Sequence, residues 1–323
     1  MVALSEEREP VIELRGLTKM YGELAAVNRL DLTIWRGEVF GLLGPNGAGK
    51  TTTILMMLGL TEPTSGSARV LGLDPTRNPL QIKRRVGYMP DDIGFYEDRT
   101  AVDNLVFTAR LNRIPPAEAE ARARELLKRV GLAEAADQKV GTFSRGMRQR
   151  LGLADVLIKR PEIIILDEPT LGIDPEGVRE LLELITRLSR EDRITVLLSS
   201  HHLHQVQQVC DRVGLFVKGR LIACGDIESL SRQLDEDGTV TVELELESWP
   251  DGLDEKLRGI GGVLSVKRGE GGKASVVCSA DLTADIAQAA VGSGGRLVAI
   301  SRRKYGLDDI YHRYFEGGEA RGA

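Results

Sequence analysis

The segment Gly44–Thr52, with the sequence GPNGAGKTT, constrains this chain more than any other. It fits the pattern G-x-x-x-x-G-K-[ST] of a phosphate-binding P-loop. Glu38–Leu43 precedes it as a predicted buried strand, and Thr53–Leu58 follows as the opening of a helix. Backbone N–H groups of such a loop point at phosphates, and the helix dipole favours negative charge there. A glycine-rich turn that fits by chance is the alternative, and the flanking strand and helix argue against it.

The side chains of this loop predict individual contacts with a nucleotide. Lys50 is expected to reach the β- and γ-phosphates, Thr51 to ligate Mg²⁺ and Thr52 to add a phosphate hydrogen bond. Glycines allow the backbone to wrap closely around the phosphates. The predicted nucleotide-binding residues of the loop are Gly44, Pro45, Asn46, Gly47, Ala48, Gly49, Lys50, Thr51 and Thr52.

Length and composition predict a two-domain protein of the cytoplasm. The chain has 323 residues, a net charge of -5 and three scattered cysteines without a C-x-x-C pair. The acidic balance does not favour nucleic-acid binding. No apolar run approaches the roughly 20 residues of a membrane-spanning helix, and the acidic N-terminus has no signal-peptide core.

Strand and helix patterns alternate along the first two thirds of the chain. Residues 1–10 are expected to form an N-terminal tail, residues 11–230 an α/β domain and residues 231–323 a smaller second domain. Continuous apolar strands predict a mostly parallel sheet. Expected strands are Val11–Leu14, Asp31–Ile34, Ile163–Leu166, Ile194–Leu198, Arg212–Lys218 and Arg220–Ala223; expected helices are Thr100–Leu111, Pro116–Val130, Arg145–Ile158 and Glu176–Ser189.

The second domain shows a different pattern after a polar linker, Ser231–Gly238. Thr239–Glu247 alternates apolar and polar residues, as expected for a half-exposed strand. Together with helices at Leu253–Ile260 and Asp281–Val291 and strands at Val263–Arg268, Ala274–Ser279 and Arg296–Ser301, it predicts the order βαββαβ of an α+β ferredoxin-like domain. A last amphipathic helix, Leu307–Phe315, packs on its own domain or on a partner.

Two adjacent carboxylates end a predicted buried strand. Asp167 and Glu168 follow Ile163–Leu166, and consecutive strand residues point to opposite faces. Asp167 can therefore hold Mg²⁺, while Glu168 orients or deprotonates an attacking water. Loop solubilisation is the alternative, and a P-loop in the same sheet argues against it.

His201 follows the next predicted strand, Ile194–Leu198. Carboxyl ends of strands in an open α/β sheet converge on the ligand crevice, so we expect His201 near the γ-phosphate. His202 and His204 follow closely, and only its position favours His201 over them. A zinc site is disfavoured, because no carboxylate or cysteine lies at ligand spacing.

A further motif, Phe143-Ser144-Arg145-Gly146-Met147, comes shortly before the strand that ends in the two carboxylates. With this motif, residues 11–230 resemble the ATP-binding subunit of an ABC transporter. The resemblance implies a P-loop nucleotide-binding domain with a helical subdomain, and two subunits paired head to tail. Ser144, Arg145 and Gly146 then act in trans on the γ-phosphate of the second subunit. Asp174 belongs to the D-loop between the two sites, Tyr21 stacks on adenine, His201 is the switch histidine and Glu168 the general base.

This chain departs from the family pattern at two places. The usual signature is L-S-G-G-Q, and here Phe143, Arg145 and Met147 replace its first, third and fifth residues. Asp91 stands where the family has a glutamine that links Mg²⁺ to the membrane-coupling region. A carboxylate can also bind Mg²⁺, so Asp91 is a candidate third metal residue, with a solvated acidic loop as the alternative.

These expectations combine into one functional hypothesis. Lys50, Glu168 and His201 catalyse hydrolysis of ATP with Mg²⁺ and so power transport, in particular export of the ABC-2 type. The expected partners are a second copy of the chain and an integral membrane permease, with no nucleic acid, and the location is peripheral on the cytoplasmic side of the membrane. The alternatives are a soluble ABC-type ATPase acting on ribosomes or nucleic acid, and a second domain that senses a ligand rather than bracing a dimer.

Overall fold

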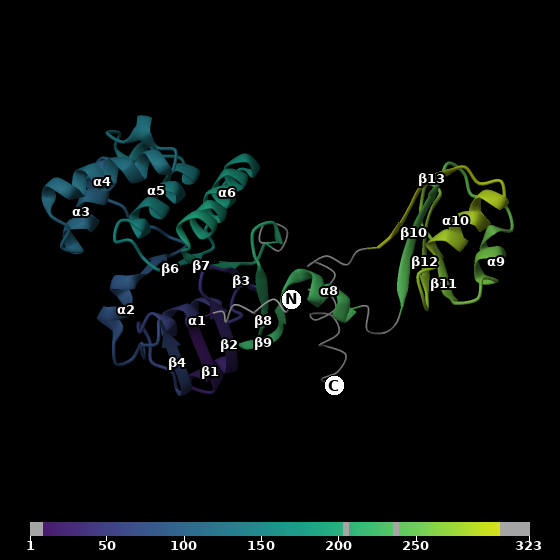
Figure 1. Cartoon of the computed structure of the whole chain (residues 1–323), viewed down its shortest axis with the longest axis horizontal. Helices are drawn as coiled ribbons and strands as arrows, with labels where there is room; N and C mark the ends of the chain where they lie inside the picture. Colours follow the sequence, from purple (N-terminus) through teal and green to yellow (C-terminus); the bar gives the residue numbers. More distant parts are fainter. Residues whose placement is uncertain (1–8, 203–206, 235–238, 304–323) are drawn as a thin grey trace, which may run out of the picture. The chain divides into compact units, whose positions relative to one another are not determined.

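The chain forms two compact units, Met1–Ile227 and Glu228–Ala323. The computed structural model describes residues 9–202, 207–234 and 239–303 (Figure 1). The predicted helix Leu307–Phe315, the linker residues 235–238, His204 and most of the predicted N-terminal tail lie outside these ranges.

A six-stranded sheet forms the centre of the first unit, in the order β5-β6-β7-β3-β8-β9. Its strands are parallel except for the hairpin of the last two. Every residue of the central strands β3, β6 and β7 is buried, as their continuous apolar runs predict. The strands are β3 (Val39–Leu43), β5 (Val86–Met89), β6 (Ile163–Asp167), β7 (Thr195–Ser200), β8 (Arg212–Val217) and β9 (Arg220–Gly225).

A second, antiparallel sheet has the order β2-β1-β4 and shares its core with the first. Its strands are β1 (Pro10–Tyr21), β2 (Leu24–Trp35) and β4 (Ser65–Val70). Helix α1 (Lys50–Met57) contributes Ile54, Met56 and Met57 to a core that also contains Ile12, Ile34, Phe40 and Ile163. The helix that follows the P-loop is thus fixed by apolar contacts to both sheets.

Helices α3 (Ala101–Leu111), α4 (Pro116–Arg129) and α5 (Arg145–Leu157) form a group beside the sheets (Figure 1). A capping box starts α3, in which the Thr100 hydroxyl accepts from the Asp103 N–H and the Asp103 carboxylate accepts from the Thr100 N–H. Short 3₁₀ turns at Ala133–Ala135 and Val140–Thr142 connect α4 to α5. Helix α6 (Pro175–Asp192) follows β6, and α8 (Ile227–Leu234) follows β9.

Apart from the two 3₁₀ turns, the described elements of the first unit that were not predicted are β4, β5 and helix α2 (Pro79–Arg85). Only two residues of β4 are buried, so the strand shows no alternation over its length. Only Ile82 is buried in α2, and β5 has four residues. The predicted strands Val11–Leu14 and Asp31–Ile34 are the centres of two strands of 12 residues each. The first half of the predicted linker Ser231–Gly238 belongs to α8.

The second unit contains β10 (Val240–Leu246), α9 (Leu253–Arg258), β11 (Val263–Arg268), β12 (Lys273–Cys278), α10 (Thr283–Gly292) and β13 (Leu297–Arg302). This order is βαββαβ, and the antiparallel sheet has the order β11-β12-β10-β13. Both helices cover one face of the sheet and close a core around Val242, Leu244 and Val276 (Figure 1). Asp281, a predicted helix cap, instead accepts from Thr283 two residues on, and Leu282 is the N-cap.

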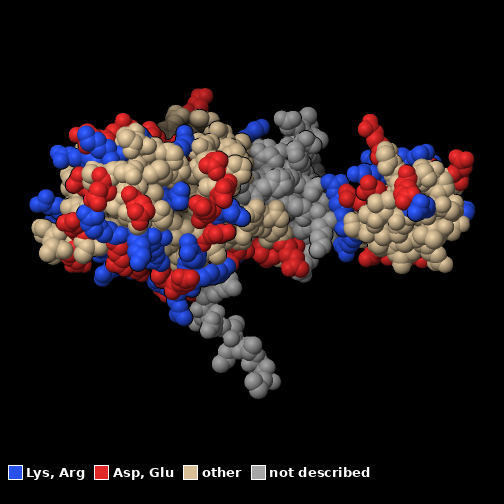
Figure 2. Space-filling model, turned by 90° about the horizontal axis from the view of Figure 1, so that it is seen from above, with Lys and Arg blue, Asp and Glu red and all other residues tan. Residues whose placement is uncertain are grey.

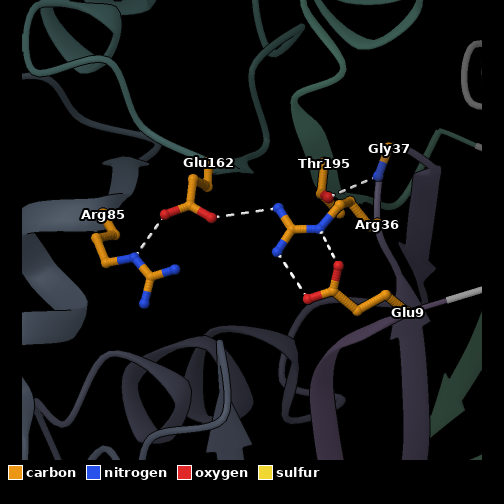
Figure 3. A network of polar contacts seen from close by, with 6 residues as sticks. All are labelled: Glu9, Arg36, Gly37, Arg85, Glu162 and Thr195. Carbon is orange, nitrogen blue, oxygen red and sulfur yellow. Dashed lines mark hydrogen bonds and ion pairs between the residues drawn. The ribbon is translucent and has the colours of Figure 1, made fainter.

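A polar network lies at the amino-terminal end of the parallel sheet (Figure 3). Glu162, just before β6, accepts from Arg85 Nε at 2.5 Å and from Arg36 Nη1 at 3.2 Å. Arg36 also donates to both carboxylate oxygens of Glu9, at 2.6 and 2.9 Å. The network joins the start of β1, the β2–β3 turn, the end of α2 and the start of β6, and so ties the two sheets together. The Arg85 hydrogen bond, followed by the Arg36 hydrogen bond, lowers the pKa of Glu162.

Replacing Glu162 by Gln should destabilise the first unit. We expect a loss of about 1 kcal/mol in the free energy of unfolding at neutral pH, since the carboxylate is partly exposed and screened by water. Because the pKa of Glu162 is lowered in the folded protein, its carboxylate stabilises the fold at every pH above the ordinary pKa of a glutamate. This stabilisation is lost as the pH falls through the lowered pKa. Denaturant unfolding over a pH series measures it, with the exposed Glu183→Gln as control. Equal stability of the two variants at neutral pH would contradict the prediction.

Candidate functional site

The predicted P-loop has the backbone of a phosphate-binding loop. A Cβ atom at Gly44 would lie 2.3 Å from the Phe216 carbonyl oxygen, and one at Gly49 would lie 2.2 Å from the Ala26 carbonyl oxygen. Only glycine therefore fits at these positions. Gly49 has φ 102° and is the N-cap of α1, without a side-chain cap for the first turn of the helix. The uncapped N–H groups of this turn are the donors that an anion accepts from.

The order of the central strands brings the predicted residues together. In β7–β3 pairing Leu43 lies opposite Ser200, and in β6–β7 pairing Asp167 lies opposite Ser199. The three strands therefore end at the same level of the sheet. The P-loop follows β3, the two carboxylates end β6, and His201 follows β7.

Thr51 and Asp167 form the predicted metal-binding pair. The Thr51 hydroxyl donates to Asp167 Oδ2 at 2.8 Å, and the other carboxylate oxygen, Oδ1, is buried. Burial raises the pKa of Asp167, and hydrogen bonding to the Ser199 and Thr51 hydroxyls partly opposes this. A hydroxyl and a buried carboxylate fit a divalent cation that takes its other ligands from water and phosphate.

Lys50, Glu168 and His201 form a second cluster beside this pair. The buried Lys50 ammonium donates to the Gly44 carbonyl at 2.6 Å and lies 3.5 Å from Glu168 Oε1. The other Glu168 oxygen lies 2.9 Å from His201 Nδ1. Glu168 itself has φ 49°, a left-handed backbone that turns the chain sharply after β6. The carboxylate is thus held between a cation and an imidazole.

Asp91 lies in the loop after β5. It lines the same cavity over the P-loop as Asp167 does. Its negative charge is among the effects that raise the pKa of Asp167, after burial. Asp91 is exposed and accepts a hydrogen bond only from the Asp92 N–H among the bonds described for it. The position fits its predicted part in metal binding.

A cavity of about 610 Å³ covers the P-loop. Its wall includes two segments that the sequence did not assign to the site: Leu24–Ala26 of β2 and the β8–β9 turn Lys218-Gly219. The Gly219 N–H donates to the Ala48 carbonyl at 2.9 Å, so the turn is bonded to the P-loop. The signal available in the sequence was the hairpin itself, which places a lysine at φ 47° before a glycine at φ 77°. We name this space the P-loop cavity; its wall consists of Leu24, Ala25, Ala26, Asn46, Gly47, Ala48, Gly49, Lys50, Thr51, Thr52, Asp91, Asp167, Glu168, Lys218 and Gly219.

Tyr21, the predicted adenine-stacking residue, lies next to the P-loop cavity. It ends β1 and pairs with Leu24, which lines the cavity. The ring is 52% exposed, and the Lys19 ammonium lies 5.2 Å from its centroid. One ring face is therefore available to a base.

The predicted signature loop and D-loop contact each other on the surface. Ser144 is the N-cap of α5 and accepts from the Met147 N–H at 3.3 Å. Asp174 is the N-cap of α6 and accepts from the Gly177 N–H at 2.9 Å. Arg145 lies across Gly172, where an added Cβ would be 2.9 Å from Arg145 Cδ. Ser144 and Arg145 are exposed and are not part of the wall of the P-loop cavity, so this chain does not bring its own signature loop to its own P-loop.

Comparison with known proteins gives sequence relatives of the nucleotide-binding unit. The family described as ABC transporter matches residues 27–171. The bacitracin transport ATP-binding protein BcrA of Bacillus licheniformis is 43% identical over 212 residues, which are 66% of this chain and 68% of that protein. The daunorubicin/doxorubicin resistance ATP-binding protein DrrA of Streptomyces peucetius is 40% identical over 223 residues, 69% of this chain and 67% of that protein.

Solved structures give the same result. The ATP-binding cassette MJ0796, solved as a dimer in a post-hydrolysis state with ADP and phosphate, superimposes with a TM-score of 0.62 at 25% identity. The match covers 67% of this chain and 98% of that one. An ATP-binding subunit of an ABC transporter matches 69% of this chain with a TM-score of 0.63 at 30% identity. The predicted P-loop fold is therefore confirmed.

Replacing Asp167 by Asn should stabilise the nucleotide-free protein. The variant removes a buried charge and keeps an oxygen for the Thr51 hydroxyl, so we expect a gain of about 1 kcal/mol at neutral pH. The raised pKa of Asp167 means that wild type gains stability relative to the variant as the pH falls, because its carboxyl then becomes neutral. Unfolding measured from neutral to acidic pH tests this, with the exposed Asp98→Asn as control. A variant less stable than wild type at neutral pH would show that burial of the charge is not the dominant effect.

Proposed function

The chain belongs to the ABC transporter family of ATP-binding proteins, and on that premise we propose which residues hydrolyse ATP and which surfaces transmit the result. It is an ATPase subunit that powers transport. The observation that carries the assignment of residues is the joint placement of Thr51–Asp167 and Lys50–Glu168–His201 at the ends of three adjacent strands.

Binding of ATP uses groups that the P-loop cavity already presents. The uncapped N–H groups of α1 and the Lys50 ammonium face the phosphates, while Tyr21 stacks on the adenine. We assign Mg²⁺ to Thr51 and Asp167, with Asp91 nearby. When bound, the cation supplies charge that neutralises the phosphate oxygens.

Hydrolysis needs a base and a means of positioning it. Glu168 accepts the proton of the water that attacks the γ-phosphate, and the contact with His201 Nδ1 orients its carboxylate. Lys50 stabilises the negative charge that develops on the phosphate oxygens. His201 is thus a positioning residue in the absence of the nucleotide.

We further propose that two copies of the chain complete each other's sites. The support is the position of Ser144 and Arg145, which are exposed and lie outside the wall of their own P-loop cavity. The N-terminus of α5, with its positive dipole end, then approaches the γ-phosphate held by the second copy. Arg145 adds a positive charge to that approach.

A membrane permease is the second partner that we propose. Tyr96 and Phe107, with Leu111 one turn further along α3, are exposed by 54%, 44% and 68%, and we call these three side chains the aromatic patch after its two rings. The Tyr96 and Phe107 rings stack edge to face at 5.3 Å, and the loop that carries Tyr96 starts near Asp91. No helix among the described residues is long and apolar enough to cross a membrane. We propose that the chain attaches to the cytoplasmic side of the permease.

We propose export as the direction of transport. The support is the name of the relative DrrA, a daunorubicin/doxorubicin resistance ATP-binding protein.

The face of the nucleotide-binding unit seen in Figure 2 gives no support to the alternative of a nucleic-acid partner. Lys and Arg are interspersed with Asp and Glu on the visible face of the nucleotide-binding unit (Figure 2). A protein that binds nucleic acid gathers its positive charges along one face.

The first test concerns Glu168. We expect Glu168→Gln to bind ATP normally and to lower the hydrolysis rate at least about 100-fold, the typical contribution of a general base. Size-exclusion chromatography should show a stable dimer in the presence of ATP.

The same test has a matched control at the signature loop. Adding Ser144→Arg to Glu168→Gln should abolish the ATP-dependent dimer while ATP still binds, because the new side chain blocks the approach of the α5 N-terminus. Hydrolysis by Glu168→Gln at the wild-type rate would overturn the assignment of the base. A dimer that forms only with ATP and persists with Ser144→Arg would overturn the trans arrangement.

The second test concerns the aromatic patch. Phe107→Ala should leave the ATPase rate of the isolated protein unchanged and weaken assembly with the permease by about 2 kcal/mol, as expected for a buried aromatic anchor. Co-purification of the permease from membranes of the source cells measures assembly. The exposed Leu80→Ala, outside the patch, is the control. Equal recovery of permease by both variants would exclude the patch as the docking surface.

A further inference from the structure

Within residues 239–303, helices cover only one face of the sheet of the second unit. Helices α9 and α10 cover the face that carries Val242, Leu244 and Val276 (Figure 1). Among residues 239–303 no helix packs on the opposite face, which we call the open face. A shallow cavity of about 460 Å³ lies there, between Glu243, Glu245, Lys267, Lys273 and Ser301.

Strand register gives the arrangement of side chains on the open face. Glu243 lies between Ser275 of β12 and Ser301 of β13, and Lys267 of β11 is opposite Ser275. In the next row Glu245 lies between Lys273 and Ala299. Each row is therefore ordered by charge, with lysines on β11 and β12 and glutamates on β10.

The uncharged positions of these rows are small. Ser275, Ser301 and Ala299 rise little above the sheet, so the long Glu and Lys side chains stand out from it. Face-to-face sheets pack about 10 Å apart. A glutamate from one sheet and a lysine from another bridge such a distance, with room beside them over the small residues.

We propose that the open face pairs with the open face of a second copy of this chain. A two-fold axis parallel to the strands, between β12 and β10, places β10 of each copy over β12 of the other. Glu245 then faces Lys273 of the second copy, and Glu243 lies close to its Lys267. The Glu245–Lys273 ion pair within one chain, at 3.7 Å, becomes half of a four-charge network.

The charge pattern also excludes the other simple arrangement. A two-fold axis perpendicular to the strands would place β10 over β10 and set glutamates against glutamates. Like charges in contact disfavour that pairing. The pattern thus favours one orientation of a second copy, and the contact requires no nucleotide.

A charge-swap experiment on the full-length protein without nucleotide tests the proposal. At low ionic strength we expect wild type to self-associate in sedimentation equilibrium and to dissociate in about 1 M salt, where the Debye length is about 3 Å. Both E243K/E245K and K267E/K273E should be monomeric alone, since each presents a single sign of charge on the open face. An equimolar mixture of the two should form a heterodimer, and a chain with all four changes should again self-associate.

Matched variants on the helix-covered side, K256E/R258E and E255K/D285K, should associate like wild type. Circular dichroism checks that the charge-swap variants are folded. A monomeric wild type at low ionic strength, or no heterodimer from the two variants, overturns the proposal. Sedimentation of wild type and of the mixed variants is measured without nucleotide. Failure of the open-face dimer is therefore distinguishable from failure of the ATP-dependent dimer of Glu168→Gln.

Discussion

Parallel pairing of β3, β6 and β7 is the constraint on which the site depends. Backbone hydrogen bonds fix Leu43 beside Ser200 and Asp167 beside Ser199, so three loops start at one level of the sheet. No single loop holds a complete site: the P-loop supplies a cation and a hydroxyl, β6 two carboxylates and the segment after β7 an imidazole. A one-residue change of register between these strands would separate Thr51 from Asp167 and Glu168 from His201.

The nucleotide-free site holds its charges at a cost. Asp167 is buried as a carboxylate, and Lys50 satisfies its ammonium with carbonyls of its own loop. An isolated buried charge is unfavourable unless it is paired. A nucleotide with its cation supplies the missing charges and donors, so ligand binding completes electrostatic contacts that the folded chain leaves open. The N-terminus of α1 is preorganised for an anion, because the core around Ile54 and Met57 fixes the direction of the helix.

The sequence predicted the parts of the site that a local pattern specifies. The P-loop, the carboxylates after an apolar strand and His201 each follow a strand, and open α/β topology alone places such positions together. Wholly buried strands such as β3 were visible as apolar runs. Residues that reach the site from an antiparallel neighbour were not assigned to it: the hairpin at Gly219 was predicted, but its contact with the P-loop, like that of Ala26, comes from tertiary packing. Strand β4 and helix α2 were missed because partial burial leaves no periodic pattern in them.

The backbone of Glu168 has a consequence for how sequences of this fold can change. A left-handed conformation disfavours every residue with a side chain relative to glycine, typically by about 1 kcal/mol. The neighbouring Asp167 is disfavoured in its charged form by burial. Two consecutive positions are thus occupied by residues that the fold alone would not select. If a descendant of this chain lost the need to hydrolyse ATP, the backbone at 168 would favour glycine and the burial at 167 would favour a neutral residue, so this dipeptide would be an early place for the loss of function to appear.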